Sequence, residues 1–298
     1  MTSRRGFTLI ELLVALVLFL IVSAAIYTLL NNTQRVSRAQ AERVDMQSNM
    51  RAGAFIVPAD LKMIGYDSVP GNATVTSDIV AMGSDSIMFR AIRASGIVCK
   101  FSAANTIVID TSATRYYSAY RAPVFGGRDL LMLFFDGDST TSSDDQWGSG
   151  LSITSVGTSG STCTAAYGSR PGFQLGTTVA YTGTSADALK LGAPFRTYEI
   201  MVYRLYQSGS KHYLGARSSS NGENSFQPVL GPLSSSGFRL DYYDSTGTTV
   251  TSVPKNVRSI QVTIIGQSDQ AINGAGGGTQ SVKNDSVVTR VTLRNALR

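Results

Sequence analysis

The stretch that decides the architecture of this 298-residue chain is residues 5–30, RGFTLIELLVALVLFLIVSAAIYTLL. From Phe7 to Leu30 it contains 24 residues, which span about 36 Å as an α-helix at about 1.5 Å per residue. This length exceeds the roughly 30 Å of bilayer hydrocarbon. Ser23-Ala24-Ala25 imitates the small-residue cleavage site of a secretory signal peptide, but the apolar residues continue beyond it. We therefore expect residues 7–30 to be retained as a transmembrane helix.

Glu11 is the lone charged residue between Phe7 and Leu30. A charge at the centre of an apolar helix costs about 2.5–3.5 kcal/mol on insertion scales, and a charge nearer to one end costs less. Such a residue usually faces a partner. The alternative is that Glu11 lies at the membrane interface and extends its carboxylate into water.

Residues 5–14, RGFTLIELLV, resemble the class III signal of type IV pilins and of type II secretion pseudopilins. The resemblance implies that residues 1–6 are a leader, and that a prepilin peptidase cuts between Gly6 and Phe7 on the cytoplasmic side and methylates the new amino group of Phe7. It also implies that the Glu11 carboxylate pairs with the terminal amine of a neighbouring subunit inside the filament. A buried pair of opposite charges is far less costly than either charge alone.

Helix-forming residues continue past Leu30, and we expect residues 31–65 to form the amphipathic half of the same helix. A mostly apolar stripe recurs at three- and four-residue steps, as expected for a helix packed on a sheet; a free coiled coil is the alternative. Pro58 should kink or break this helix because it has no amide donor, and Gly65 suits its end. The stripe consists of Val36, Ala39, Arg43, Met46, Met50, Gly53, Val57, Leu61 and Ile64.

The residues at the end of this helix narrow the resemblance to one group within these pilin-like proteins. Met50-Arg51-Ala52, followed by DLKMIGY at 60–66, is similar to the helix end of PilW-like minor pilins, although Pro58 departs from that pattern. The sequence VTLRN at 291–295 resembles the closing strand of the same group and of related pseudopilins.

Beyond Gly65 apolar residues alternate with polar ones, which is typical of half-buried antiparallel strands. The alternation is clearest at 238–243, 259–264 and 287–293, and further strands are expected at 87–92, 106–111, 130–135 and 177–182.

A hairpin with a five-residue loop at 207–211 should join the strand at 198–206 to the strand at 212–217. Candidate loops are 136–150, 157–168, 218–225 and 266–283. One long helix followed by strands predicts an α+β fold, ladle-shaped, with residues 66–298 as a β-rich head.

Cys99 and Cys163 are the two cysteines of the chain. If the head lies outside the cytoplasm, a disulfide between them is the natural interpretation, and two unpaired thiols in a core are the alternative. The bond would close a loop of about 65 residues and contribute roughly 4 kcal/mol in the chain-entropy description.

Composition argues against most enzymatic and nucleic-acid functions. The net charge of +6 is spread without a block of five Lys or Arg, which favours a solvated surface over a dedicated DNA interface. A catalytic triad would have to include His212, the single histidine, which lies at an expected hairpin tip. We predict no catalytic residue and no cofactor.

The densest acidic cluster, residues 136–145, lacks the spacing of a calcium-binding EF-hand. Counting from Asp136, the positions that need Gly and Glu hold Thr141 and Trp147. A solvated acidic loop is therefore the default interpretation, and we predict no metal site.

The resemblance implies a non-enzymatic minor pilin of a type IV pilus that helps to initiate assembly near the tip and supports adhesion, twitching motility or DNA uptake. Its implied partners are other minor and major pilins, the prepilin peptidase, the inner-membrane assembly platform and a tip adhesin. It would cross the inner membrane once with a periplasmic head, and reach the cell surface in the pilus. Alternatives are a minor pseudopilin of a type II secretion system, a membrane-anchored adhesive or DNA-binding head, and an anchored hydrolase.

Overall fold

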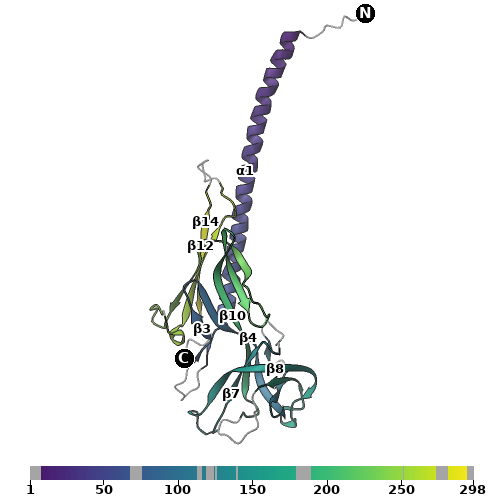
Figure 1. Ribbon diagram of the computed structural model, residues 1–298, viewed down its shortest axis with the longest axis vertical. Coiled ribbons are helices and arrows are strands. Elements are labelled where there is room, and N and C mark those ends of the chain that lie inside the picture. Colours follow the sequence, from purple (N-terminus) through teal and green to yellow (C-terminus); the bar gives the residue numbers. More distant parts are fainter. Residues whose placement is uncertain are drawn as a thin grey trace, which may run out of the picture.

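The computed structural model describes residues 8–67, 76–112, 116–118, 124, 126–138, 140–178, 189–250, 252–272 and 281–293, with residues 158–160 described by their backbone alone. One long α-helix and a large antiparallel β-sheet make up this part of the chain. The predicted α+β architecture is therefore confirmed. Figure 1 shows the helix as a stalk that stands on a β-rich head.

The stalk is α1 (Leu9–Leu61), a helix of 53 residues and about 80 Å in length. It continues through Pro58, so the prediction that Pro58 breaks the helix is wrong. Proline removes one amide donor, but here it stands in the last turn, where the Lys62 N–H still donates to the Pro58 carbonyl (3.0 Å). The helix ends four residues before Gly65, whose N–H donates to the Asp78 carboxylate (2.9 Å).

Twelve described strands form one sheet in the order β14-β13-β12-β11-β10-β7-β8-β9-β5-β4-β3, with β6 paired to β4 beside this path and β10 also paired to β4. A separate two-stranded sheet joins β1 to β2. The strands are Tyr66–Asp67 (β1), Thr76–Ser77 (β2), Ile79–Met82 (β3), Ser86–Ala103 (β4), Thr106–Asp110 (β5), Tyr117–Ser118 (β6), Leu130–Phe135 (β7), Gln146–Thr162 (β8), Pro171–Thr177 (β9), Pro194–Ser208 (β10), Lys211–Ser218 (β11), Gln227–Tyr243 (β12), Ser259–Gln267 (β13) and Asn284–Thr292 (β14).

The second half of α1 packs on β12, β13 and β14. The predicted stripe is buried from Met46 onward, whereas Val36 is 56% exposed and Arg43 is exposed. The stripe begins at Met46 because β13 ends there: Met46 and Met50 lie against Gly266, near the end of that strand. The period-two patterns at 238–243, 259–264 and 287–293 are confirmed, with their apolar sides turned to this core.

Several predicted connections are wrong. The hairpin β10–β11 turns through the two residues Gly209 and Ser210, not five, because Ser208 pairs with Lys211 and Gly209 supplies a positive φ of 63°. The strand expected at 177–182 shares only Thr177 with β9, which ends there, and its residues 179–182 lie outside the described residues, so this prediction stays open. The facing ends of the loops expected at 136–150 and 157–168, residues 146–150 and 157–162, belong to β8, a long strand whose Ser, Thr and Gly residues conceal its strand pattern.

The head consists of two lobes, each with its own hydrophobic core. The proximal lobe comprises the second half of α1 with β3, β11–β14, the first half of β4 and the second half of β10. The distal lobe comprises β5, β7, β8 and β9 with the remaining halves of β4 and β10. Figure 1 shows β7 and β8 at the end of the molecule opposite the N-terminus. Among the described strands, only β4 and β10 run through both lobes and contribute to both cores.

A disulfide joins Cys99 of β4 to Cys163, which directly follows β8. Both cysteines are buried against Val108 of β5. The bond therefore lies inside the distal lobe and ties together segments that are 64 residues apart.

Gly53 lies at a close approach between α1 and the sheet. A Cβ atom built there would lie 2.5 Å from Leu230 Cδ2 and 3.0 Å from Ile264 Cδ1. We expect Gly53→Leu to lower the free energy of unfolding by about 1–3 kcal/mol, because the side chain must force the helix off the sheet. Ala52→Leu, on the exposed side of the same turn, is the matched control and should change it by less than about 0.5 kcal/mol. Urea denaturation in detergent checks this, and equal effects of both variants would contradict it.

The double variant Cys99→Ser/Cys163→Ser should lower the stability of the distal lobe by roughly 4 kcal/mol, because the unfolded chain regains the freedom of a long loop. Proteolysis sites mapped by mass spectrometry would check the location of the effect. Cleavage should rise in β5, β8 and β9 and not in β12–β14, and a uniform rise throughout the head would contradict the assignment.

Candidate functional site

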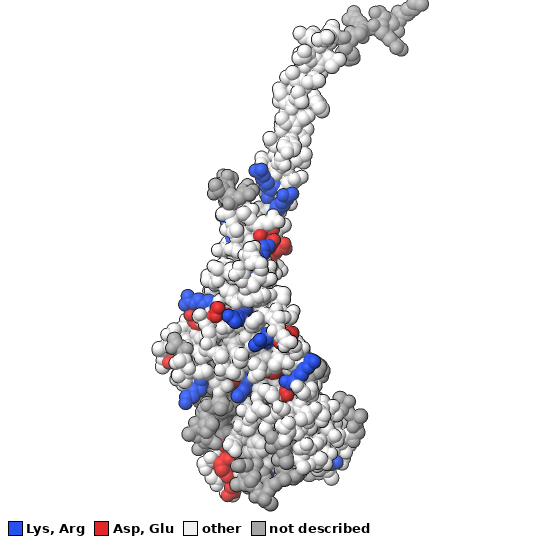
Figure 2. Space-filling view, in the orientation of Figure 1, with Lys and Arg blue, Asp and Glu red and all other residues white. Residues whose placement is uncertain are grey.

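The first half of α1 presents a largely apolar surface, with Glu11 as its one charged side chain up to Leu30, that nothing in the described structure covers. The side chains of Leu9, Phe19 and Leu30 are 82%, 69% and 54% exposed, and no residue of α1 before Met46 is buried. Figure 2 shows this protruding part of the stalk free of Lys, Arg, Asp and Glu over the face in view. Among the described residues, α1 is one helix whose length and composition suit a membrane span.

An α-helix suits an apolar environment because its backbone groups bond to one another along the helix. Exposed leucine, isoleucine, valine and phenylalanine side chains each gain roughly 1.5–3 kcal/mol when they are fully buried away from water. Such a surface requires lipid chains or other apolar helices around it. The site is therefore a surface for association, not a cleft for a small molecule.

Glu11 lies in the first turn of this surface and forms a reciprocal cap with Thr8. The Thr8 backbone N–H and Oγ1 donate to Glu11 Oε2 at 2.9 and 3.0 Å. The Glu11 N–H in turn donates to Thr8 Oγ1 at 3.4 Å. This capping box satisfies two of the amide donors that a helix start leaves unpaired.

The cap holds the carboxylate in a defined place on the outside of the helix. Both bonds from Thr8 use Glu11 Oε2, so Oε1 takes part in neither. A negative charge at a helix N-terminus is favoured by the helix dipole. A cationic group on a neighbouring molecule can therefore approach a carboxylate that is already oriented. Gly6 and Phe7, the predicted processing residues, lie outside the described residues.

Thr8 was not singled out by the sequence analysis, although its signal was present. Thr8 followed three residues later by Glu11 is the sequence pattern of a capping box. Glu11 was considered only as a costly charge within a membrane span, and its role in capping the start of the helix was not.

The acidic loop is held by its own hydrogen bonds and by a lysine. Asp138 accepts from the Thr140 N–H (3.0 Å) and hydroxyl (2.9 Å), which lower the pKa of Asp138. Lys190 Nζ lies 3.3 Å from Asp136 Oδ1. Desolvation and the neighbouring carboxylates Asp136 and Asp144 raise the pKa of Asp145. Within the described ranges, no three His, Cys, Asp or Glu side chains gather in a way that could hold a metal ion.

His212 lies in β11, directly after the hairpin turn, and is partly exposed, so it is near the tip as expected. Its position on the strand is opposite Gln207 of β10 and Leu233 of β12. His212, Glu11 and the disulfide therefore lie in three different parts of the structure: on β11, at the start of α1 and in the distal lobe.

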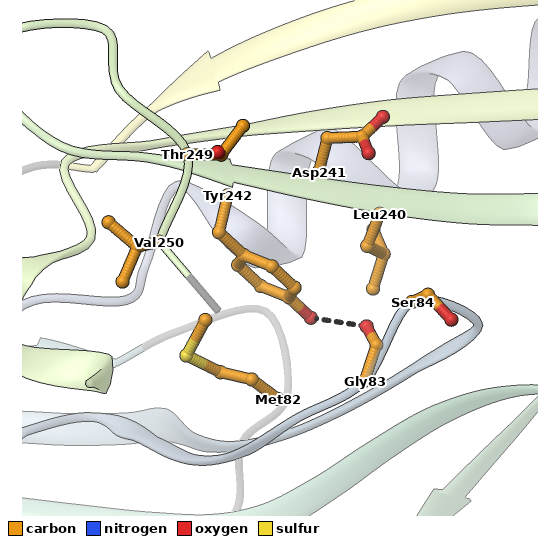
Figure 3. Close-up of a pocket in the computed structure, with 8 residues that line it drawn as sticks. All are labelled: Met82, Gly83, Ser84, Leu240, Asp241, Tyr242, Thr249 and Val250. Atoms are coloured by element: carbon orange, nitrogen blue, oxygen red, sulfur yellow. Dashed lines mark hydrogen bonds between the residues drawn. The ribbon is translucent and has the colours of Figure 1, made fainter. Parts of the chain in front are cut away.

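A pocket of about 490 Å³ lies between the β3–β4 turn and β12. Figure 3 shows the Tyr242 ring reaching across it to Gly83, while Asp241 points away. The Tyr242 hydroxyl donates to the Gly83 carbonyl (3.0 Å), and burial raises the pKa of this phenol. Arg239 Nη2 holds Asp241 at 2.8 Å. The Tyr242 hydroxyl thus fastens the turn to the strand.

Comparisons with known proteins find a matching family and a similar protein. Residues 1–27 match the family described as "Prokaryotic N-terminal methylation motif". The type II secretion system protein J of Vibrio cholerae serotype O1 is 29% identical over 86 residues, which are 29% of this chain and 39% of that protein. The chain thus spans about two fifths of the length of this relative. No solved structure matches the chain.

The methylation motif, the uncovered apolar helix that continues from it and the antiparallel β-rich head make this chain similar to type IV pilin-like proteins.

Proposed function

We propose that this chain is a minor pilin of a type IV pilus, a non-enzymatic structural subunit that helps to initiate assembly at or near the tip. The observation that carries the proposal is the combination at the start of α1: a methylation motif, a fully exposed apolar surface, and one carboxylate oriented on it. The families suggested by the comparisons are those of structural subunits.

The proposed mechanism uses the apolar surface twice. Before assembly, residues 7–30 cross the inner membrane and the head lies in the periplasm. During assembly the same side chains leave the lipid and pack against the helices of neighbouring subunits, which leaves their apolar burial nearly unchanged. Apolar side chains gain no more from neighbouring helices than from lipid chains, because both surroundings are apolar. Packing and polar contacts therefore decide which subunits associate.

Glu11 supplies that polar contact in the proposed filament. Its carboxylate pairs with the terminal amine of Phe7 on an adjacent subunit, once the leader of residues 1–6 has been removed by a prepilin peptidase. A charge left unpaired among apolar helices is costly, so the pair fixes the axial position of one subunit against the next. The proposed partners are other minor and major pilins, the inner-membrane assembly platform and a tip adhesin, and the filament carries the head to the cell surface.

The second candidate function is a minor pseudopilin of a type II secretion system. The similarity to type II secretion system protein J favours it. The helix end from Met50 to Tyr66, which resembles that of PilW-like minor pilins, favours the pilus. Deletion in the native host separates the two: loss of surface pili with normal protein export supports the pilus, and the reverse result supports secretion.

N-terminal mass spectrometry of the membrane form tests the processing step. We expect a mature chain that begins at Phe7 with one methyl group on its amine. Gly6→Ala should leave the leader in place, because the bulkier residue occupies the cleavage position. A wild-type chain that retains Met1 would disprove this part of the proposal.

Glu11→Ala and Thr8→Ala separate assembly from helix capping. Glu11→Ala removes both the cap and the carboxylate, whereas Thr8→Ala removes only the partner of the cap. We expect Glu11→Ala to reduce the number of pili per cell at least tenfold. Thr8→Ala should cost about 1 kcal/mol of local helix stability and leave pilus number within a factor of two. Electron microscopy measures the pili, and equal defects in both variants would show that Glu11 acts only through the cap.

A further inference from the structure

A buried cluster of charges lies where the two lobes meet. Arg93 of β4 binds Asp129 (Nε to Oδ2, 3.0 Å) and Glu199 of β10 (Nη1 to Oε1, 3.0 Å). Ser218 donates to Glu199 Oε2, and Ser220 donates to Asp129 Oδ1. The side chain of Arg93 is 4% exposed, and both carboxylates are fully buried. We call these five residues the junction cluster.

The backbone changes direction and partner at this cluster. Along β4 and β10, Thr197 pairs with Ala94 and Tyr198 pairs with Ile92, so Arg93 is the extra residue of a β-bulge. A bulge bends its strand and redirects the side chain of the extra residue. The bend lies between the residues of β4 that belong to the proximal core, up to Ala91, and those of the distal core, from Ala94.

The other side of β10 is divided at the same level. Residues 201–208 of β10 pair with β11, whereas residues 195–198 pair with β7. Asp129 directly precedes β7, and Ser218 and Ser220 lie at the end of β11 and just beyond it. The junction cluster therefore binds all four segments that meet where the sheet divides between the lobes.

The chemistry of the cluster favours a fixed geometry over added stability. All four oxygens of the two carboxylates accept a hydrogen bond or ion pair, and a planar guanidinium can hold two carboxylates at set angles. Replacing buried ion pairs by apolar residues of similar volume often leaves the stability of a protein unchanged or raises it. Two hydrophobic cores joined by apolar contacts alone would have many similar arrangements at a bent, divided sheet.

We propose that the Arg93 bulge is a hinge between the lobes and that the junction cluster is the latch that holds it at one angle. The latch sets the direction of the distal lobe relative to α1, independently of whether the chain serves a pilus or a secretion system. The hinge consists of the two strands shared by both lobes, and the latch contacts each of the segments that meet there.

Distances between spin labels in the full-length chain, in detergent micelles, test this proposal. One label pair, at Gln47→Cys on α1 and Ser149→Cys on β8, reports the angle between the lobes; both sites are exposed. A second pair, at Gln47→Cys and Ser236→Cys on β12, lies within the proximal lobe and serves as the internal reference. The native cysteines are joined in the disulfide and do not take up label.

Arg93→Lys keeps the charge and removes the planar fork. We expect the width of the inter-lobe distance distribution to at least double in this variant, while the proximal pair is unchanged. Arg239→Lys is the matched control, because Arg239 also binds a carboxylate, Asp241 at 2.8 Å, but is 64% exposed and lies on β12 of the proximal lobe, away from the strands shared by the two lobes. It should leave both distributions as they are.

An apolar triple variant, Arg93→Met/Asp129→Leu/Glu199→Met, separates latching from folding. It should fold, with the circular dichroism spectrum of the wild type, and show the same doubled width between the lobes. If Arg93→Lys and the triple variant both keep the wild-type distribution, the proposal is wrong. It is also wrong if the triple variant does not fold, since the fold itself would then require the charges.

Discussion

The rest of the structure depends on one constraint: a single helix must be stable in two different environments. From Leu9 to Leu30 its surface is apolar on every side, whereas from Met46 to Leu61 only the side that faces β12–β14 is buried. The sheet therefore cannot extend toward the N-terminus, where it would cover side chains that have to meet lipid or other helices. The head instead extends in the opposite direction, as a distal lobe beyond the end of α1 (Figure 1).

Two groups of hydrogen-bonded charged side chains lie at boundaries of the structure, one at the start of α1 and one between the two cores of the head. Glu11 and Thr8 cap the helix where it starts, and the side chains that protrude after them are free of charge until Arg35. Three of the buried charged side chains lie together where the two cores meet, with Arg93 between Asp129 and Glu199. In both places a carboxylate is oriented by hydroxyl groups, so that its charge acts in a defined direction.

How far sequence reasoning succeeded follows from the range of each interaction. The helix and the strands at 238–243 and 259–264 were predictable because periodicity is local and strong there. The β10–β11 turn was misjudged because Gln207 and Ser208 continue the strand in spite of their polarity. The strand β8 and the Arg93 bulge were missed, since both depend on partners far away in sequence. For the site, Glu11 was found by its unusual charge, whereas Thr8 required attention to helix capping.

The two strands shared by both lobes also have a consequence for the order in which the chain matures as it is made. The pairing of β4 with β10 brings together residues that are about one third of the chain apart, and the α1 core is completed only by β14 near the C-terminus. The distal lobe lacks its half of β10 until synthesis has passed residue 198, and the proximal lobe lacks β14 until synthesis has passed residue 292. The first half of β4 therefore lacks its partner β10 until about two thirds of the chain has been made, and structures dominated by such distant pairings form slowly.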